Sequence, residues 1–374
     1  MSEARAAFRS RIYRIFCIFI LFYAAASASY LGFYTLWHFH EAGAAGHWDL
    51  PYGIDDVLNG TAYRPVIYRQ MIPATANWLD KEIPQGIKDR VIRQRFSHDP
   101  NPNSSPLRYN KAYLIRYEIV YDVSFLFAFL AVIAMYLVCK SFGFSPMVCI
   151  FTPVVFILIF PYFLNWGGYY YDYPELAFFA LSIWIAREYK WWWLLPVALL
   201  ATWNKETYLI FIPMLYPFVR AKLSRLQAFA GIGCLCAASF AVYYRIHTMF
   251  QGNLTGPAVS RWREHLDMLV HFYQLFIRID TIYNIYTLSS FSFFPLAMIT
   301  WTVCRGWHRF TPEFKLHAKI AALINFPLFF FFCSLYEMRN LSMLYMVFLL
   351  GLAVNLQETF AGKKAAAGVD SCCI

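Results

Sequence analysis

The sequence predicts an all-α, polytopic membrane protein with about ten transmembrane helices, some of them short or broken. Hydrophobic residues make up 60% of the 374 residues and charged residues 14%, whereas soluble domains average about 45–50% apolar and about 25% charged. The apolar residues form continuous runs, and many runs meet or approach the roughly 20 residues that cross a bilayer. Membrane β-barrels instead show alternating segments of about ten residues, so the predicted class is helical.

The net charge of +10 does not indicate a nucleic-acid partner. The basic residues lie mostly between the apolar runs, where the positive-inside rule places them. The nine cysteines lie in or beside apolar runs or in the C-terminal tail, so neither a disulfide framework nor a spaced set of metal ligands follows. Membrane lipids are therefore expected partners, and nucleic acid is not.

Arginines that precede the first apolar run place the N-terminus in the cytoplasm. The long polar segment 38–116 then becomes the first extracytoplasmic loop, since the first helix ends near residue 37. We expect three membrane crossings after this loop: inward over 117–140, outward over 146–164 and inward again over 174–187.

The segment 191–222 must cross the membrane outward and then inward within roughly 30 residues, although two full spans need about 40. Short or broken helices that turn at 204–207 are therefore predicted. Irregular backbone at membrane depth is tolerated only where protein or a wet cavity covers it. This turn is thus a candidate site.

The remaining helices are expected at about 226–246, 284–304, 320–335 and 341–354, with a second sizeable outer loop at 247–283. Residues 357–374 form a cytoplasmic tail, and residues 1–374 are one integral membrane domain, which we expect in a bacterial inner membrane with both termini cytoplasmic. No internal repeat is evident, which disfavours an inverted-repeat transporter.

This topology brings ionisable residues from four loops to the outer face. They are Asp49, Asp55, Asp56, Arg64 and Arg69 in the first loop, Asp172 and Glu175 in the next, Lys205 and Glu206 at the tight turn, and Glu337 and Arg339 before the last helix. Ionisable groups at membrane depth are costly and are candidates for function. The alternative is that they form a solvated rim or keep a loop soluble.

The chemistry available to these residue types is specific. A carboxylate can take a proton from an acceptor hydroxyl, while arginine binds phosphate bidentately and lysine binds it as a point charge. A second carboxylate can orient an acceptor or hold a divalent ion together with phosphate oxygens. This combination favours a lipid-phosphate donor over a nucleotide-sugar, because no glycine-rich phosphate loop is present.

Three short motifs carry a family resemblance. They are Trp48-Asp49 with Asp55-Asp56, then Tyr171-Asp172-Tyr173-Pro174-Glu175, then Asn204-Lys205-Glu206-Thr207. With the long first outer loop, they resemble the GT-C superfamily of multi-pass membrane glycosyltransferases. The run Arg64-Pro65…Tyr68-Arg69…Pro73 also resembles uncharacterised bacterial membrane proteins of that kind. The resemblance implies transfer of a sugar from a polyprenyl-phosphate donor to a glycan, lipid or protein acceptor on the extracytoplasmic face.

The resemblance also implies roles for residues. One first-loop acid among Asp49, Asp55 and Asp56 would be the general base, and Asp172 would support the acceptor or a metal. Arg64, Arg69, Lys205 and Arg339 would hold the donor phosphate, with Glu175, Glu206, Glu337 and Tyr171 in support. No cofactor is certain, and Mg or Mn at Asp172 is the option that the resemblance leaves open.

Three alternatives remain at this stage. A glycan polymerase or ligase of a surface polysaccharide pathway would place its key bases in a later loop, and 247–283 holds Arg261, Arg263 and Arg278. A lipid or solute transporter, or a flippase, would need charged groups within helices, and few are present beyond Arg245 and Lys205. A non-catalytic scaffold would leave the converging charges without an explanation.

Overall fold

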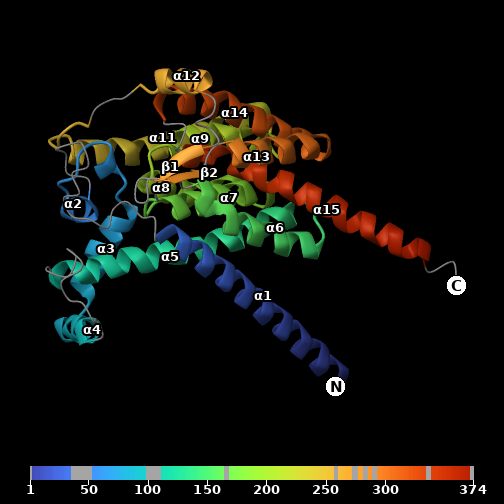
Figure 1. The fold of residues 1–374 in the computed structure, drawn as a ribbon, viewed down its shortest axis with the longest axis horizontal. Helices are drawn as coiled ribbons and strands as arrows, with labels where there is room; N and C mark the ends of the chain where they lie inside the picture. The colour runs from blue at the N-terminus through green and yellow to red at the C-terminus, as the bar shows by residue number, and fades with distance from the viewer. Residues whose placement is uncertain are drawn as a thin grey trace.

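The computed structural model describes residues 2–34, 53–97, 111–163, 168–256, 260–271, 277–280, 285–288, 293–333 and 338–370. The protein is a polytopic, predominantly helical membrane protein (Figure 1). Among the described residues, 6 helices are long and apolar enough to cross a membrane. They are built from α1 (Ser2–Tyr34), α5 (Lys111–Ser141), α6 (Pro146–Ile159) with η3 (Phe160–Phe163), α11 (Arg225–Met249), α14 (Pro312–Phe332), and η8 (Met338–Leu344) with α15 (Tyr345–Asp370).

Shorter helices complete the bundle. They are α7 (Asp172–Glu188), η4 (Trp191–Trp193), α8 (Leu194–Asn204), α9 (Tyr208–Phe211), η5 (Ile212–Leu215), α10 (Tyr216–Arg220), α13 (Phe293–Gly306) and η7 (Trp307–Arg309). The segment 191–222 contains short helices, as predicted. Pro213 and Pro217 lie at the starts of η5 and α10, where proline removes a backbone donor and interrupts a continuous helix.

The first polar segment folds onto the bundle. It contains α2 (Ile54–Asn59), η1 (Val66–Tyr68), α3 (Met71–Glu82) and α4 (Gln85–Ser97), and α3 packs against both α5 and α8. Ile54, Ile67 and Ile72 are at most 1% exposed, and each such side chain contributes roughly 1.5–3 kcal/mol on burial. The stretch from Ile54 to Ile72 is therefore part of the packed structure.

The second predicted outer loop also contains ordered elements. It holds α12 (Trp262–Val270) and strand β1 (Ile277–Asp280), which pairs antiparallel with β2 (Ile285–Leu288) just beyond the loop. The predicted helical start at residue 284 is wrong, because 285–288 is a strand and α13 begins at Phe293. Isoleucine, threonine and tyrosine fit a pleated surface well, and this local preference competes with the apolar pattern that suggested a helix.

Helix α7 lies at the centre of the bundle, in contact with α5, α8, η8 and α15 (Figure 1). Figure 1 also shows α2, α3 and α4 at one end of the molecule, whereas the N-terminal end of α1 and the C-terminal end of α15 extend at the other. The first turn of α7 is therefore buried at the end that carries the first polar segment.

Candidate functional site

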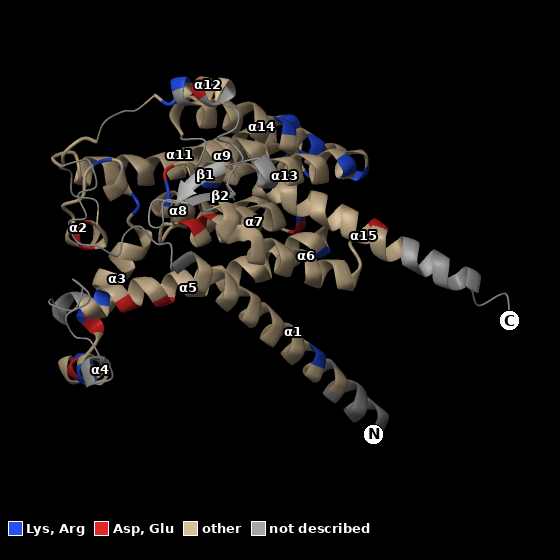
Figure 2. Cartoon of the chain, viewed as in Figure 1, with Lys and Arg blue, Asp and Glu red and all other residues tan. Residues whose placement is uncertain are grey.

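Charged side chains are sparse inside the bundle, and Figure 2 shows acidic and basic segments meeting where α7 and α8 lie. Asp172, Glu175, Lys205 and Arg339 are each at most 8% exposed, although they come from three separate parts of the chain. We call the following set the polar cluster: Arg69, Tyr171, Asp172, Glu175, Lys205, Glu206 and Arg339. Buried charge of this kind is costly unless it is paired, so the contacts within the cluster decide its chemistry.

The start of α7 fixes the acidic side of the cluster. Asp172 Oδ2 accepts a hydrogen bond from the Tyr169 backbone N–H at 2.8 Å, and both Asp172 and Glu175 lie in the first turn of the helix. Carboxylates are stabilised there by the helix dipole. Asn204, the last residue of α8, donates through Nδ2 to the Tyr171 carbonyl at 3.0 Å. This bond joins the end of α8 to the start of α7.

The most buried ion pair is Lys205 with Glu175. The Lys205 Nζ to Glu175 Oε2 distance is 2.8 Å, and both side chains are 5% exposed. Glu175 Oε1 also accepts hydrogen bonds from Thr207 Oγ1 at 3.3 Å and Ser342 Oγ at 2.9 Å. Because its oxygens are shared among three donors, Glu175 is committed to holding α7, η8 and the turn after α8 together.

Arg69 occupies the opposite wall, directly after η1. Its NH1 donates to the Tyr171 hydroxyl at 2.7 Å, and its NH2 lies 3.4 Å from Glu206 Oε1. The Tyr170 hydroxyl donates to the Arg69 carbonyl at 2.9 Å. The first polar segment thus supplies a guanidinium that is tied to α7 and to the turn after α8.

Arg339 completes the cationic wall from η8. Its NH1 donates to the Tyr171 hydroxyl at 3.3 Å and lies 3.9 Å from Asp172 Oδ2. The guanidinium carbon lies 3.7 Å from the Tyr169 ring centroid, a cation–π arrangement. The Tyr171 hydroxyl is therefore shared by two guanidinium groups from distant segments, which creates a local concentration of positive charge.

The buried atoms of the cluster with no hydrogen-bond partner among the described residues include Asp172 Oδ1, Glu206 Oε2 and Arg69 Nε. Buried polar atoms are usually satisfied by protein or by ordered water. Two carboxylate acceptors and one guanidinium donor thus have capacity for a bound polar group. The Glu206 side chain is 23% exposed and the Asp172 side chain 2%, so Glu206 is the more accessible acid.

Sequence reasoning did not identify His247 as a site residue. Its ring stacks on Tyr68 at 3.7 Å and lies 4.0 Å from Tyr243, measured between centroids. Within the described part of the chain its buried Nε2 has no hydrogen-bond partner. Tyr243 and His247 are four residues apart, and this spacing predicts that their rings lie on one face of a helix. The sequence does not indicate that Tyr68 stacks on His247.

The other predicted residues lie elsewhere or outside the described residues. Asp56 Oδ2 accepts the Gly53 N–H at 3.0 Å at the start of α2, and its Oδ1 accepts from Thr61 at 3.3 Å. Burial, and then the charge of the adjacent Asp55, raise the pKa of Asp56. Asp55 also lies on α2, with a buried Oδ1 that has no partner in the described part of the chain.

Arg64, which was predicted to bind the donor phosphate, donates instead to the Thr255 hydroxyl. The two residues also form a parallel backbone bridge that joins the first polar segment to the chain after α11. Asp49 and Glu337 lie outside the described residues. Their predicted roles therefore stay predictions.

The Asp56 cap gives a direct test of its structural role. We expect Asp56→Ala to lower the free energy of unfolding by about 1 kcal/mol, because the Gly53 N–H loses its acceptor. Asp56→Asn keeps an acceptor oxygen and is the matched control, with a change within about 0.5 kcal/mol. Thermal unfolding in detergent measures both, and equal losses for the two variants would contradict the capping role.

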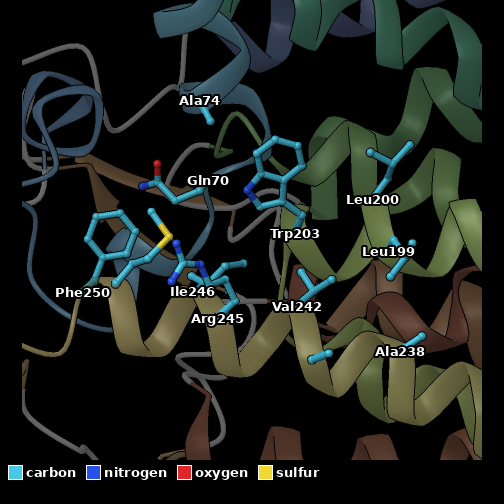
Figure 3. A pocket seen from close by; sticks show the side chains of 12 residues that line it. Gln70, Ala74, Leu199, Leu200, Trp203, Ala238, Val242, Arg245, Ile246 and Phe250 are labelled. Carbon is cyan, nitrogen blue, oxygen red and sulfur yellow. The ribbon is translucent and has the colours of Figure 1, made fainter.

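An apolar cavity of about 670 Å³ adjoins the polar cluster. Its walls come from α3, α8 and α11 and the chain beside them. Figure 3 shows Gln70 and Arg245 toward one end of the cavity and Leu199, Leu200 and Ala238 toward the other. Gln70 follows Arg69 in the chain and Trp203 lies two residues before Lys205, so the cavity lining and the cluster adjoin along the chain, although the described lining residues include no member of the cluster.

The donor set does not fit a divalent ion. No group of three or more His, Cys, Asp or Glu side chains with metal-binding geometry exists among the described residues. Asp172 faces Arg339 at 3.9 Å and Glu175 is bonded to Lys205, and these cations oppose a second positive charge. We therefore derive no step through the Mg or Mn that the resemblance left open at Asp172.

Comparison of the chain with protein-family models, with curated proteins and with solved structures found no match in any of the three. The function proposed below therefore depends on the chemistry of the polar cluster and the cavity.

Proposed function

We propose that this protein is a membrane glycosyltransferase that moves a sugar from a polyprenyl-phosphate donor to a glycan, lipid or protein acceptor. The observation that carries the proposal is the presence of both a buried cationic wall and a 670 Å³ apolar cavity, whose lining residue Gln70 directly follows Arg69 in the chain. A lipid-linked phosphate is the class of ligand that needs both surfaces at once. A free nucleotide-sugar would leave the apolar cavity without a role.

The donor phosphate is assigned to Arg69 and Arg339. Their guanidinium groups meet at the Tyr171 hydroxyl, and guanidinium matches phosphate oxygens with paired donors. Lys205 was also expected to bind phosphate, but its ammonium is committed to Glu175 at 2.8 Å. We therefore assign Lys205 to positioning of the turn that carries Glu206.

Glu206 is assigned as the proton acceptor for the acceptor hydroxyl. Its Oε2 has no hydrogen-bond partner in the described part of the chain, and Arg69 holds its Oε1 at 3.4 Å. Asp172 is less exposed and is assigned to orienting Arg339. Asp49, expected from the resemblance as a candidate base, lies outside the described residues.

The proposed step balances without a cofactor. The acceptor oxygen forms a bond to the anomeric carbon of the sugar as the bond from that carbon to the phosphate oxygen breaks. The bonding electrons leave with the phosphate, where Arg69 and Arg339 stabilise the added negative charge. The acceptor hydroxyl proton passes to Glu206.

The cavity is assigned to the first isoprene units of the donor. We expect Ala238→Phe to weaken binding of polyprenyl phosphate at least about tenfold, because the added ring occupies space that buried CH₂ groups would fill at about 0.8 kcal/mol each. Ala237→Phe is the matched control, since Ala237 is the preceding residue of α11, is exposed, and does not line the cavity. Equal affinity of the two variants would contradict this assignment.

The proposal as a whole is tested by comparing polyprenyl phosphate with polyprenol of equal length, each bound to the protein in nanodiscs. A hydrogen bond to a charged group contributes about 1.5–3 kcal/mol, so we expect the phosphate to bind at least about tenfold more tightly. Sugar transfer is then measured as release of polyprenyl phosphate from a panel of polyprenyl-phosphate sugars. Equal binding of phosphate and alcohol would overturn the proposal.

A lipid or solute transporter, or a flippase, remains the second candidate, because Arg245 lies within α11 on the wall of the apolar cavity. A flippase would bind the lipid phosphate but release no sugar from it. We place the cluster on the extracytoplasmic face of a bacterial inner membrane, where the charge pattern of the loops favours it. Labelling of a Gln85→Cys variant by an impermeant reagent in intact cells tests this orientation.

A further inference from the structure

A second hollow lies at the opposite end of α7 from the polar cluster. Its volume is about 660 Å³, and its walls come from the end of α7, from η4 and from the chain after α10. Helix α7 has 17 residues, so its ends lie about 25 Å apart at 1.5 Å per residue. We call this hollow the Trp–Lys pocket, defined by Tyr189, Lys190, Trp191, Trp192, Trp193 and Lys222.

The indole rings of the pocket have two different environments. Trp191 packs against α11, where a Cβ placed on Gly231 would lie only 3.1 Å from the ring. Trp192 and Trp193 are 49% and 58% exposed. Half-exposed indoles at helix ends of a membrane protein suit the boundary between headgroups and acyl chains, since the ring is apolar and the N–H is polar.

Two lysines from segments distant in sequence reach the same hollow. Lys190 Nζ lies 4.8 Å from the Trp192 ring centroid. Lys222 Nζ donates to the Tyr189 carbonyl at 2.9 Å, and an ammonium group has three donors, so two hydrogens remain for another acceptor. The carboxylate that lines the pocket is Glu188, which is exposed.

We propose that the Trp–Lys pocket binds the headgroup of an anionic membrane phospholipid. The phosphate lies between Lys190 and Lys222, because lysine binds phosphate as a point charge. The glycerol and the upper part of the acyl chains lie against Trp192 and Trp193. Charge complementarity and the interfacial indoles favour a lipid over an acidic protein segment, which would not need exposed tryptophan at the end of a membrane helix bundle.

The test measures retention of phosphatidylglycerol and phosphatidylcholine by the full-length protein, using native mass spectrometry after release from mixed nanodiscs. A lysine near the membrane surface contributes about fivefold to attraction of anionic lipid, so Lys190→Gln with Lys222→Gln should weaken phosphatidylglycerol binding about 30-fold. Phosphatidylcholine retention should be low and unchanged. Thermal unfolding of the double variant confirms that it folds.

The matched control is Lys315→Gln with Lys319→Gln, which removes the same charge from α14 without touching the pocket. We expect this control to retain phosphatidylglycerol as the unmodified protein does. Equal losses in both double variants, or equal retention of phosphatidylcholine, would overturn the proposal. Displacement of the lipid by millimolar inorganic phosphate alone would assign the site to a free anion and would also overturn it.

Discussion

Lys205→Met is expected to lower the free energy of unfolding by about 3–5 kcal/mol, because it leaves the Glu175 carboxylate buried without its cation. The two side chains are each 5% exposed and lie 2.8 Å apart. Charge at this depth has no water to replace the lost partner. Thermal unfolding in detergent or nanodiscs measures the change.

A second substitution distinguishes the loss of charge pairing from the loss of side-chain packing as the cause of the destabilisation. In Lys205→Met with Glu175→Gln no uncompensated charge remains, and the amide oxygen still accepts from Thr207 and Ser342. We expect the double variant to recover most of the lost stability, and a double-mutant cycle gives the coupling. The less buried pair Lys88 with Asp80, 2.9 Å apart with side chains 17% and 23% exposed, is the matched control, and Lys88→Met should cost less than about 1 kcal/mol. Equal losses for Lys205→Met and Lys88→Met would contradict the buried pair.

Glu206→Gln is expected to lower the rate of sugar transfer by about 10²–10⁴-fold, the usual contribution of a positioned general base. The amide keeps the shape of the side chain and an oxygen for Arg69, so donor binding and folding should change little. The measurement is release of polyprenyl phosphate from a donor sugar, with polyprenyl phosphate affinity measured in parallel. Glu188→Gln, at the other end of α7, makes the same chemical change outside the cluster.

The comparison with Asp172→Asn decides between the two acids. Asp172 lies 3.9 Å from Arg339, so its loss of charge should alter donor affinity through the guanidinium. If Asp172→Asn removed transfer with donor binding intact while Glu206→Gln did not, the two roles would be exchanged. Full activity in both variants would contradict proton transfer to either residue.

Much of the helical architecture follows from the length of apolar runs. The short helices between 191 and 222 were predicted because the segment is too short for two spans, and proline positions explain where they break. The helices of the first polar segment were not predicted, since α2 has only 6 residues and isolated helices of that length are marginal in water. The helices of the first polar segment are stabilised by packing on the bundle, chiefly of α3 against α5 and α8. Periodicity in the sequence does not indicate such tertiary contacts.

The sequence predicted which residues lie in the site better than it predicted which of them contact one another. Tyr171, Asp172, Lys205 and Arg69 do lie together, because the predicted loops place them at one end of the bundle. Which cation meets which carboxylate depends on helix rotation and on side-chain reach, and the sequence carries no simple signal for either. Asp56 was grouped with these residues by its charge and by its place in the Asp55-Asp56 motif of the first loop, although its local role as a cap is readable three residues after Gly53.

The polar cluster has a consequence for charge balance. In their ordinary ionisation states its cations equal its carboxylates in number: Arg69, Lys205 and Arg339 against Asp172, Glu175 and Glu206. A sugar-linked polyprenyl phosphate adds one negative charge, and the released phosphate monoester carries about one more. Under the proposed function, the proton taken by Glu206 offsets that increase. The polar cluster together with its bound lipid phosphate then keeps the same net charge through turnover, and the proton leaves with the product.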